Sequence, residues 1–188
     1  KLIDNIQNYR SGIGNFEKIL KLGEGGYGNV YLVKDLNLSS QVEVSSNDNT
    51  TNNNSTNVYF ALKEIRKKDI SSSNGTDGFM HERDVLKTNH DYITKLHMSF
   101  QDHHKLYFVM DFMSGGDFEN LLEIIDEKIN EGCLDFDELE FNMSFYALEI
   151  INGINAVHKL GYIYRDVKPS NILVDGTGHL KMSDFGTC

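Results

Sequence analysis

Three polar residues in the last quarter of the chain have the types and spacing that phosphoryl transfer requires. Asp166 and Asn171 fit the pattern Asp-x-x-x-x-Asn, and Asp184 opens an Asp-Phe-Gly thirteen positions after Asn171. Phosphoryl transfer needs little covalent help, but it needs two oxygen ligands for magnesium and one carboxylate for the attacking hydroxyl. A lone Asp or Asn in a loop is usually a turn former, whereas three in this order, with Lys168 between them, form a specific signal. We expect Asn171 and Asp184 to bind Mg²⁺ and Asp166 to meet the hydroxyl.

A lysine and a glutamate earlier in the chain predict an ion pair at the same site. Lys63 lies in the strand-like run FALKEI, where a lysine is more often a solvated side chain. Glu82 follows nineteen positions later on the apolar face of a helical segment, where an unpaired carboxylate is costly to bury. Pairing the two would hold the Lys63 ammonium group against the phosphates of a nucleotide.

The glycines Gly23, Gly25 and Gly28 form Gly-x-Gly-x-x-Gly, which by itself is a weak signal. A dinucleotide-binding fingerprint needs a helix directly after the glycines, but residues 29–33 (NVYLV) continue as a strand. A hairpin flap whose backbone N–H groups cover nucleotide phosphates fits the pattern better.

Several strands and one helix must position these residues in the first part of the chain. Residues 16–34 predict a hairpin over a glycine tip, and residues 58–65, 95–100 and 106–110 predict further strands. Residues 79–87 predict a short helix with Phe79, Glu82 and Leu86 on one face. The Asn-, Ser- and Thr-rich residues 39–57 bury too little apolar area to offset their ordering entropy, so we expect a disordered insertion there.

Helical patterns dominate after a glycine-containing connector that begins at residue 111. Asp137 and Glu140 are spaced like a capping box, and Gly161 is placed as a helix stop. Between them, large apolar residues recur at helical spacing and predict a buried stripe: Phe141, Phe145, Leu148, Ile151 and Ile154. The tail from 162 to 183 alternates short β-like runs with polar turns. The whole pattern predicts an α+β fold of two lobes, with an N-terminal extension (1–15), a β-rich lobe (16–110) and the first part of a helical lobe (111–188).

Composition limits the class of protein. The 188 residues carry a formal net charge of −10, which argues against nonspecific nucleic-acid binding and favours basic peptide partners. No apolar run approaches the roughly 20 residues of a spanning helix. The two cysteines, Cys133 and Cys188, show no metal spacing, and no signal peptide opens the chain, so we expect a cytoplasmic or nuclear location.

With these motifs in place, the chain resembles a protein kinase of the AGC group from residue 16 to 188, apart from the insertion. The segments ERDVL (82–86), SFQD (99–102), LYFVMDF (106–112) and GGDF (115–118) resemble the NDR/LATS branch, which includes the septation kinases. The Rho-kinase and myotonic-dystrophy-kinase branch is the next most similar. The resemblance implies a serine/threonine kinase that uses ATP and Mg²⁺ and acts on protein substrates. Relatives of the NDR type often require a small helical coactivator on the first lobe.

The resemblance also implies a role for each matching residue. Asp166 would be the catalytic base, Lys168 a γ-phosphate contact and Lys63 an α/β-phosphate contact paired with Glu82. Met110 would be the gatekeeper, Asp111 and Met113 would meet adenine through their backbones, and Asp117 would meet the ribose. The nucleotide-binding set as a whole comprises Gly23, Glu24, Gly25, Gly26, Gly28, Val30, Ala61, Lys63, Glu82, Met110, Asp111, Met113, Asp117 and Leu173. A regulatory stack of apolar side chains would comprise Leu86, Leu96, Tyr164 and Phe185.

Four residues refine this expectation. Tyr164 replaces the usual histidine of His-Arg-Asp in a packing role. Ser170 stands where many members carry an acidic residue, which weakens selection for arginine in the substrate. Arg165 resembles the arginine that binds an activation-loop phosphate, and Thr187 resembles residues associated with threonine acceptors.

Two other functional classes compete with an active kinase. A truncated or regulatory kinase-like module would bind nucleotide without turnover, because the chain stops before the elements that anchor the substrate. A dinucleotide-dependent oxidoreductase would account for the glycines alone.

Overall fold

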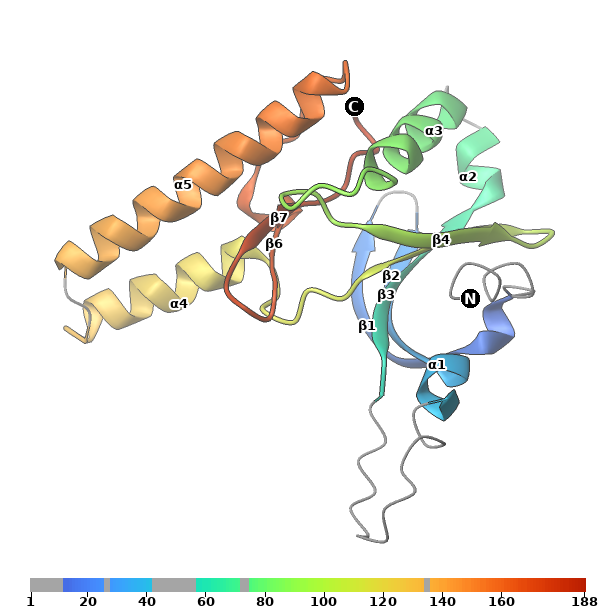
Figure 1. Cartoon of the computed structure of the whole chain (residues 1–188), viewed down its shortest axis with the longest axis horizontal. Coiled ribbons are helices and arrows are strands. Elements are labelled where there is room, and N and C mark those ends of the chain that lie inside the picture. Colours follow the sequence, from blue (N-terminus) through green and yellow to red (C-terminus); the bar gives the residue numbers. More distant parts are fainter. Residues whose placement is uncertain (1–11, 26–27, 42–56, 72–74, 134–135) are drawn as a thin grey trace, which may run out of the picture. The chain divides into compact units, whose positions relative to one another are not determined.

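The computed structural model of the chain describes residues 12–25, 28–41, 57–71, 75–133 and 136–188 (Figure 1). Contacts divide these residues into two compact units. The first runs to Lys68 and includes Met98–Met110, and the second comprises Asp69–His97 and Asp111–Cys188. The second unit therefore takes in residues 69–97, which the division at Met110 had assigned to the first lobe. No helix among the described residues has the length and apolar character needed to cross a membrane.

The first unit is built on a five-stranded sheet, as the sequence predicted. Its strands stand in the order β1-β2-β3-β5-β4, with β1 and β2 joined as an antiparallel hairpin. The strand bounds are β1 (Phe16–Gly25), β2 (Gly28–Asp35), β3 (Tyr59–Arg66), β4 (Leu96–Gln101) and β5 (Lys105–Asp111). A 3₁₀ turn (Ile13–Asn15) precedes β1, and the short helix α1 (Leu36–Gln41) follows β2.

One face of this sheet forms the core of the first unit. Strand side chains alternate between faces, and the buried cluster on the core face consists of Phe16, Val33, Phe60, Leu62, Tyr107 and Val109. Aromatic rings contribute to it, since Phe100 lies between Phe16 and Tyr107 with centroid distances of 6.1 and 4.9 Å. This apolar packing fixes the register of β2 against β3, and so fixes which side chains point to the opposite face.

The second unit combines helices with a small hairpin. Its helices are α3 (Gly75–Leu86), α4 (Phe118–Asn130) and α5 (Phe136–Lys159), and the short helix α2 (Lys67–Ser71) spans the boundary between the units. A 3₁₀ turn (Pro169–Asn171) leads into β6 (Ile172–Val174), which pairs antiparallel with β7 (Leu180–Met182). Helix α5 contacts β7, and α4 contacts both β6 and α5, the latter through the edge-on pair Phe118 and Tyr146.

Helix α5 ends as the sequence predicted. Gly161 has a φ of 87°, which glycine adopts without steric cost. Its N–H donates to the carbonyl of His158 at 2.9 Å, and the N–H of Tyr162 donates to that of Val157 at 3.4 Å. These two bonds form a Schellman motif, which satisfies carbonyl groups that the helix end leaves without partners.

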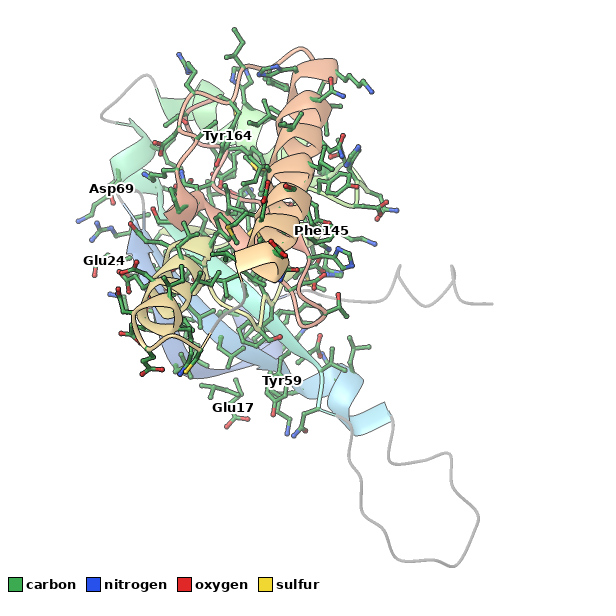
Figure 2. All side chains as sticks on the ribbon, turned by 90° about the vertical axis from the view of Figure 1, so that its left-hand side faces the viewer. Glu17, Glu24, Tyr59, Asp69, Phe145 and Tyr164 are labelled. Carbon is green, nitrogen blue, oxygen red and sulfur yellow. The ribbon has the colours of Figure 1, made fainter. Side chains whose placement is uncertain are left out.

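The start and the buried face of α5 differ from the expectation. The helix begins at Phe136, so Asp137 lies inside its first turn and not at the N-cap position. The expected buried stripe is wrong for Phe145, Leu148 and Ile151, which are 37%, 60% and 60% exposed (Figure 2, where Phe145 is labelled). Ile154 is half-buried, and the side chain of Phe141 lies outside the described part of the structure. The buried face instead carries small side chains and one carboxylate: Glu149, Gly153, Ala156 and Val157.

The insertion predicted for residues 39–57 is described only at its edges. Residues 39–41 complete helix α1, and Asn57 directly precedes β3. Residues 42–56 lie outside the described part of the chain.

Candidate active site

Asp166, Lys168 and Asn171 form one hydrogen-bonded cluster in the second unit. The ammonium group of Lys168 donates to Asp166 Oδ2 at 2.8 Å, and Asn171 Nδ2 donates to the same oxygen at 2.9 Å. Asn171 Nδ2 also lies 3.0 Å from the backbone oxygen of Asp166. Asn171 is buried, whereas the Asp166 side chain is 37% exposed. The buried amide thus holds a carboxylate that still faces solvent.

The two neighbours of Asp166 keep its carboxylate ionised. The hydrogen bond from Lys168, and then that from Asn171, lower the pKa of Asp166 below its usual range. The same contact with Asp166 raises the pKa of Lys168. Both groups are therefore charged at neutral pH, so Asp166 can accept a hydrogen bond from a hydroxyl and Lys168 can face an anionic oxygen.

The backbone of Asn171 connects this cluster to Asp184. The carbonyl of Asn171 accepts hydrogen bonds from the N–H and the hydroxyl of Ser183, both at 2.9 Å. Ser183 directly precedes Asp184, and its own carbonyl accepts a 2.7 Å bond from the Tyr164 hydroxyl. The expected base and one expected metal ligand, Asn171, therefore belong to one bonded network, and the other, Asp184, directly follows a member of it.

Asp184 has an unusual backbone conformation. Its φ is 52°, and it is the only non-glycine residue with positive φ in the described part of the chain. Such a conformation is uncommon outside glycine, and it persists only where the surrounding structure imposes it. Residues held in this way cluster at active sites, which is consistent with a functional Asp184.

The donor set of Asn171 and Asp184 fits magnesium better than a softer metal. Because the amide nitrogen of Asn171 donates to Asp166, its oxygen is directed away from that carboxylate and can act as a ligand. A carboxylate and an amide oxygen are hard donors of the kind that Mg²⁺ prefers. Among the described residues no group of three or more His, Cys, Asp or Glu side chains could hold a metal ion.

Residues of the expected apolar stack are buried in the second unit. Leu86, Leu96, Tyr164 and Phe185 are 1%, 9%, 4% and 0% exposed, and the rings of Tyr164 and Phe185 lie 5.4 Å apart (Figure 2 labels Tyr164). Burial, together with the charge of Asp184, raises the pKa of the Tyr164 phenol, which keeps it a neutral hydrogen-bond donor. The tyrosine that replaces the usual histidine therefore packs on Phe185 and also bonds to the backbone at Ser183.

The connector that begins at Asp111 is attached to the β6–β7 hairpin. Gly115 donates to the carbonyl of Val174 at 3.0 Å, and Val174 donates to the carbonyl of Gly116 at 2.8 Å. Asp117 and Leu173 form an isolated antiparallel bridge, so the expected ribose and nucleotide contacts are neighbours. Asp117 is also the N-cap of α4, where its Oδ1 accepts from the N–H of Asn120 at 2.8 Å. Met113 is buried beside this attachment.

Two residues that the sequence analysis did not single out contact Asp111. His97 Nε2 lies 2.6 Å from Asp111 Oδ1, and Lys181 Nζ lies 3.1 Å from Asp111 Oδ2. Burial alone would raise the pKa of Asp111, but the bonds from His97 and Lys181 outweigh it and lower that pKa to about 2. The one sequence signal for Lys181 is its place between two apolar residues, Leu180 and Met182, because alternation along a strand directs the lysine to the other face.

Four of the expected nucleotide-binding residues of the first unit share one face of its sheet. Val30 pairs with Gly23 on β1 and with Lys63 on β3, so these three residues form a row across the hairpin and β3. Ala61 precedes Lys63 by two positions and points to the same face. Met110 belongs to this face too, because it alternates with Val109 of the core cluster. The structure therefore groups Val30, Ala61, Lys63 and Met110 on the side opposite the core.

The glycine motif closes a β-hairpin. Gly25 pairs with Gly28 as the last pair of β1 and β2, and Glu24 lies exposed at this end with Lys21 Nζ 2.5 Å from its carboxylate. Strand β2 follows the glycines directly, which rules out the helix that a dinucleotide fingerprint needs at that point. The expected contact at Gly26 lies outside the described residues.

The expected pair of Lys63 and Glu82 spans the two units. Lys63 is half-buried on β3 of the first unit, and Glu82 is 3% exposed on α3 of the second. Each residue has interactions within the structure. Their pairing with one another stays a prediction.

Arg165 contacts the segment that follows Asp-Phe-Gly. Its Nε donates to the carbonyl of Thr187 at 2.5 Å, and His81 of α3 lies 3.3 Å from the carbonyl of Cys188. The arginine expected to bind a phosphate thus bonds to the backbone directly after Asp-Phe-Gly in this structure.

Comparison with known proteins agrees with this arrangement. Residues 16–188 match the protein kinase domain family. The serine/threonine-protein kinase tricornered of Drosophila melanogaster is 35% identical over 184 residues, which is 97% of this chain and 34% of the fly protein. The serine/threonine-protein kinase LATS2 of Mus musculus is 37% identical over 177 residues (92% of this chain, 14% of that protein). The serine/threonine-protein kinase ppk35 of Schizosaccharomyces pombe is 37% identical over 173 residues (92% and 23%).

These relatives confirm the resemblance to the NDR/LATS branch that the motifs predicted. The chain spans about a third or less of the length of the curated relatives it matches. Since the family match extends over residues 16–188 and includes both the glycine hairpin and the Asp166–Asn171–Asp184 network, the chain belongs to the protein kinase domain family.

Proposed function

We propose that this protein is a serine/threonine protein kinase that transfers the γ-phosphoryl group of ATP to hydroxyl groups of protein substrates. The observation that supports this best is the network in which Asn171 binds Asp166 through its side chain and Ser183, next to Asp184, through its backbone. This network supports the proposal because it joins Asp166, the proposed base, to Asn171 and to the residue that precedes Asp184, the two proposed metal ligands. The relatives are named serine/threonine-protein kinases, which agrees with the proposal.

The proposed chemistry divides among the residues as follows. The oxygen of the substrate hydroxyl bonds to the γ-phosphorus while the bond from that phosphorus to the β–γ bridging oxygen breaks. Asp166 accepts the proton that the substrate hydroxyl loses. Lys168 stabilises charge on the transferred group, and Asn171 holds the Asp166 carboxylate in place. Magnesium, bound by Asn171 and Asp184, would neutralise phosphate charge.

The first unit supplies the proposed nucleotide contacts. Backbone N–H groups at Gly23, Glu24, Gly25, Gly26 and Gly28 cover the phosphates, and Lys63 binds the α/β-phosphates. Val30, Ala61 and Met110 form an apolar surface for the adenine ring, because they share the face that carries Lys63. Asp111, Met113, Asp117 and Leu173 of the second unit complete the proposed set.

Charge supports a substrate class. The net charge of −10 favours peptides that are basic around the acceptor. We propose in addition that a helical coactivator binds the first unit, by analogy with kinases of the NDR type, and that the protein works in the cytoplasm or nucleus.

Phosphoryl transfer to peptides tests the proposal. The purified chain is incubated with MgATP and a library of basic peptides carrying serine or threonine, and phosphopeptides are quantified by mass spectrometry. Asp166→Ala should lower kcat by about 10²- to 10⁴-fold, the usual contribution of a general base. Glu131→Gln, on an exposed α4 terminus, is the matched control and should leave kcat unchanged.

Two results would redirect the assignment. Magnesium-dependent binding of ATP without transfer would favour a regulatory module that binds nucleotide without turnover. Stabilisation by NAD but not by MgATP would contradict the kinase assignment altogether.

A further inference from the structure

The carboxylate of Asp111 lies between two cationic or hydrogen-donating side chains that come from distant parts of the second unit. His97 reaches it from β4, and Lys181, seventy positions away in the sequence, reaches it from β7. The Asp111 side chain is 24% exposed, with Lys181 and His97 at 22% and 31%. Each carboxylate oxygen therefore has its own partner in a partly desolvated place, a geometry that restrains the side chain and the backbone behind it.

The backbone of Asp111 is restrained as well. Its N–H donates to the carbonyl of Lys95 at 3.1 Å, so the chain is held to the residue directly before β4 where the connector begins. A few residues on, Gly115 and Gly116 bond to Val174 of β6. The connector is thus attached to the β6–β7 hairpin at both ends, by backbone bonds at 115–116 and by the Asp111 side chain at its start.

Lys181 connects this attachment to the network around Asp184. It lies on β7 three positions before Asp184, and it pairs across the hairpin with Leu173. Strand β7 is itself fixed by Thr94, whose N–H and hydroxyl bond to the carbonyl of Met182 at 3.0 and 2.8 Å. Lys181 therefore extends from a rigid strand, and this is what allows it to position Asp111.

We propose that Asp111, His97 and Lys181 form a clasp at the start of the connector, in which the side chain of Asp111 positions the backbone groups of residues 111–113 to bind adenine. The proposal rests on the kinase function proposed above, and it adds residues His97 and Lys181 to the determinants of nucleotide affinity. Asp111 is a positioning residue here, because its side chain acts through its own backbone.

For the MgATP affinity of Asp111→Asn, a long-range charge effect predicts the opposite of what the clasp predicts. Asp111→Asn removes a negative charge, so a long-range charge effect would strengthen the binding of anionic MgATP. Loss of the clasp would weaken it. Lys181→Met removes a positive charge and weakens MgATP under either hypothesis, so the two variants together separate the explanations.

Equilibrium titration of the whole chain with MgATP and, separately, with adenosine tests the clasp. We expect Asp111→Asn and Lys181→Met each to raise Kd by roughly threefold to tenfold for both ligands, the range expected for a displaced hydrogen-bonding group. The double variant should bind no more weakly than either single variant, since both disrupt one unit. Lys181→Arg and His97→Gln keep a hydrogen-bond donor at each position and should retain most of the affinity of the unaltered chain. Glu131→Gln, which removes an ion pair elsewhere, is the control and should leave Kd unchanged.

The outcomes separate the clasp from the proposed function. If the unaltered chain binds MgATP and Asp111→Asn binds both ligands equally well or more tightly, the clasp is wrong and the kinase assignment stands. A lowered Tm with unchanged Kd would show a purely structural role and would also overturn it. Failure of the unaltered chain to bind either ligand would overturn both proposals.

Discussion

Gly23 and Gly28 belong to the same glycine motif, but the structure gives only one of them a packing reason to be glycine. A Cβ atom at Gly28 would overlap the backbone carbonyl group of Glu64 on β3, whereas a Cβ atom at Gly23 would have no heavy atom within 4 Å. Gly28→Ala must therefore push β2 away from β3. The close approach of two strands, in addition to any phosphate contact, explains that glycine.

This difference predicts unequal effects on stability. Gly28→Ala should lower the free energy of unfolding by about 1–3 kcal/mol, the usual range for overpacking a closely packed site. Gly23→Ala, its matched control, should change it by about 0.5 kcal/mol or less. Urea denaturation of the two variants measures both values. If the two variants are destabilised equally, the close approach of β2 and β3 at Gly28 is wrong.

Asn171 carries a second prediction at this scale. Its buried amide donates twice to Asp166, so truncation leaves the Asp166 backbone oxygen and carboxylate without those bonds. Asn171→Ala should destabilise the fold by about 1–3 kcal/mol, independently of any metal. Asn130→Ala, which removes an exposed contact with Asp126 on α4, should have little effect. If both variants unfold at the same urea concentration as the unaltered chain, Asn171 has no structural role.

The local sequence motif indicated the hydrogen-bonded cluster of the second unit, but it gave no sign of contacts between residues that are distant in the sequence. The cluster of Asp166, Lys168 and Asn171 lies within six positions, so its spacing carries the signal. Asp111 and Lys181 are seventy positions apart, and no periodicity connects them. Only the pairing of β7 with its neighbours brings them together, and that pairing is a tertiary property.

At the scale of elements, helix α5 shows the same limit. The spacing of its large apolar residues correctly indicated a helix, because a 3.6-residue period identifies an apolar stripe. It did not indicate which face packs on β7. That face needs small side chains: a Cβ atom at Gly153 would come within 3.3 Å of atoms of both Met182 and Tyr92. Close packing therefore selected the side with Gly153 and Ala156.

Glu149 attaches the same face of α5 to the turn before β7. It is 6% exposed, accepts from the N–H of Leu180 at 2.8 Å and lies 2.7 Å from His179 Nδ1. The hydrogen bond and the charge of Glu149 raise the pKa of His179 above 6.5. A folded-state pKa above the unfolded value adds stability that is complete below about pH 6.5 and is lost as pH rises through the folded value.

This linkage predicts a pH-dependent contribution of His179. The stability difference between the unaltered chain and His179→Gln should be larger at pH 6 than at pH 9. Because the His179 side chain is 55% exposed, solvent screening limits the change to about 0.5 kcal/mol or less. Chemical denaturation at a series of pH values measures it. The pH dependence should disappear in Glu149→Gln, and its persistence there would assign it to another group.

At the scale of the whole molecule, the apolar residues of α5 that face away from β7 become important. Phe145, Leu148 and Ile151 follow one another at three-residue spacing, and Leu160 and Ile163, beyond the helix end, are 42% and 67% exposed. Monomeric soluble proteins rarely expose contiguous apolar patches of more than a few hundred Å².

The 188-residue chain by itself should therefore self-associate through the outer stripe of α5. Complete burial of each exposed leucine or isoleucine side chain contributes roughly 1.5–3 kcal/mol of favourable free energy, which favours association at micromolar concentration. Leu148→Glu combined with Ile151→Glu should shift the chain toward monomer in sedimentation velocity. It should leave the helical circular dichroism unchanged, because both side chains are 60% exposed. Val157→Glu, on the buried face of the same helix, should instead unfold it. If the double variant loses its helical signal as Val157→Glu does, then the outer stripe is part of the fold after all, and the packing of α5 described above is wrong.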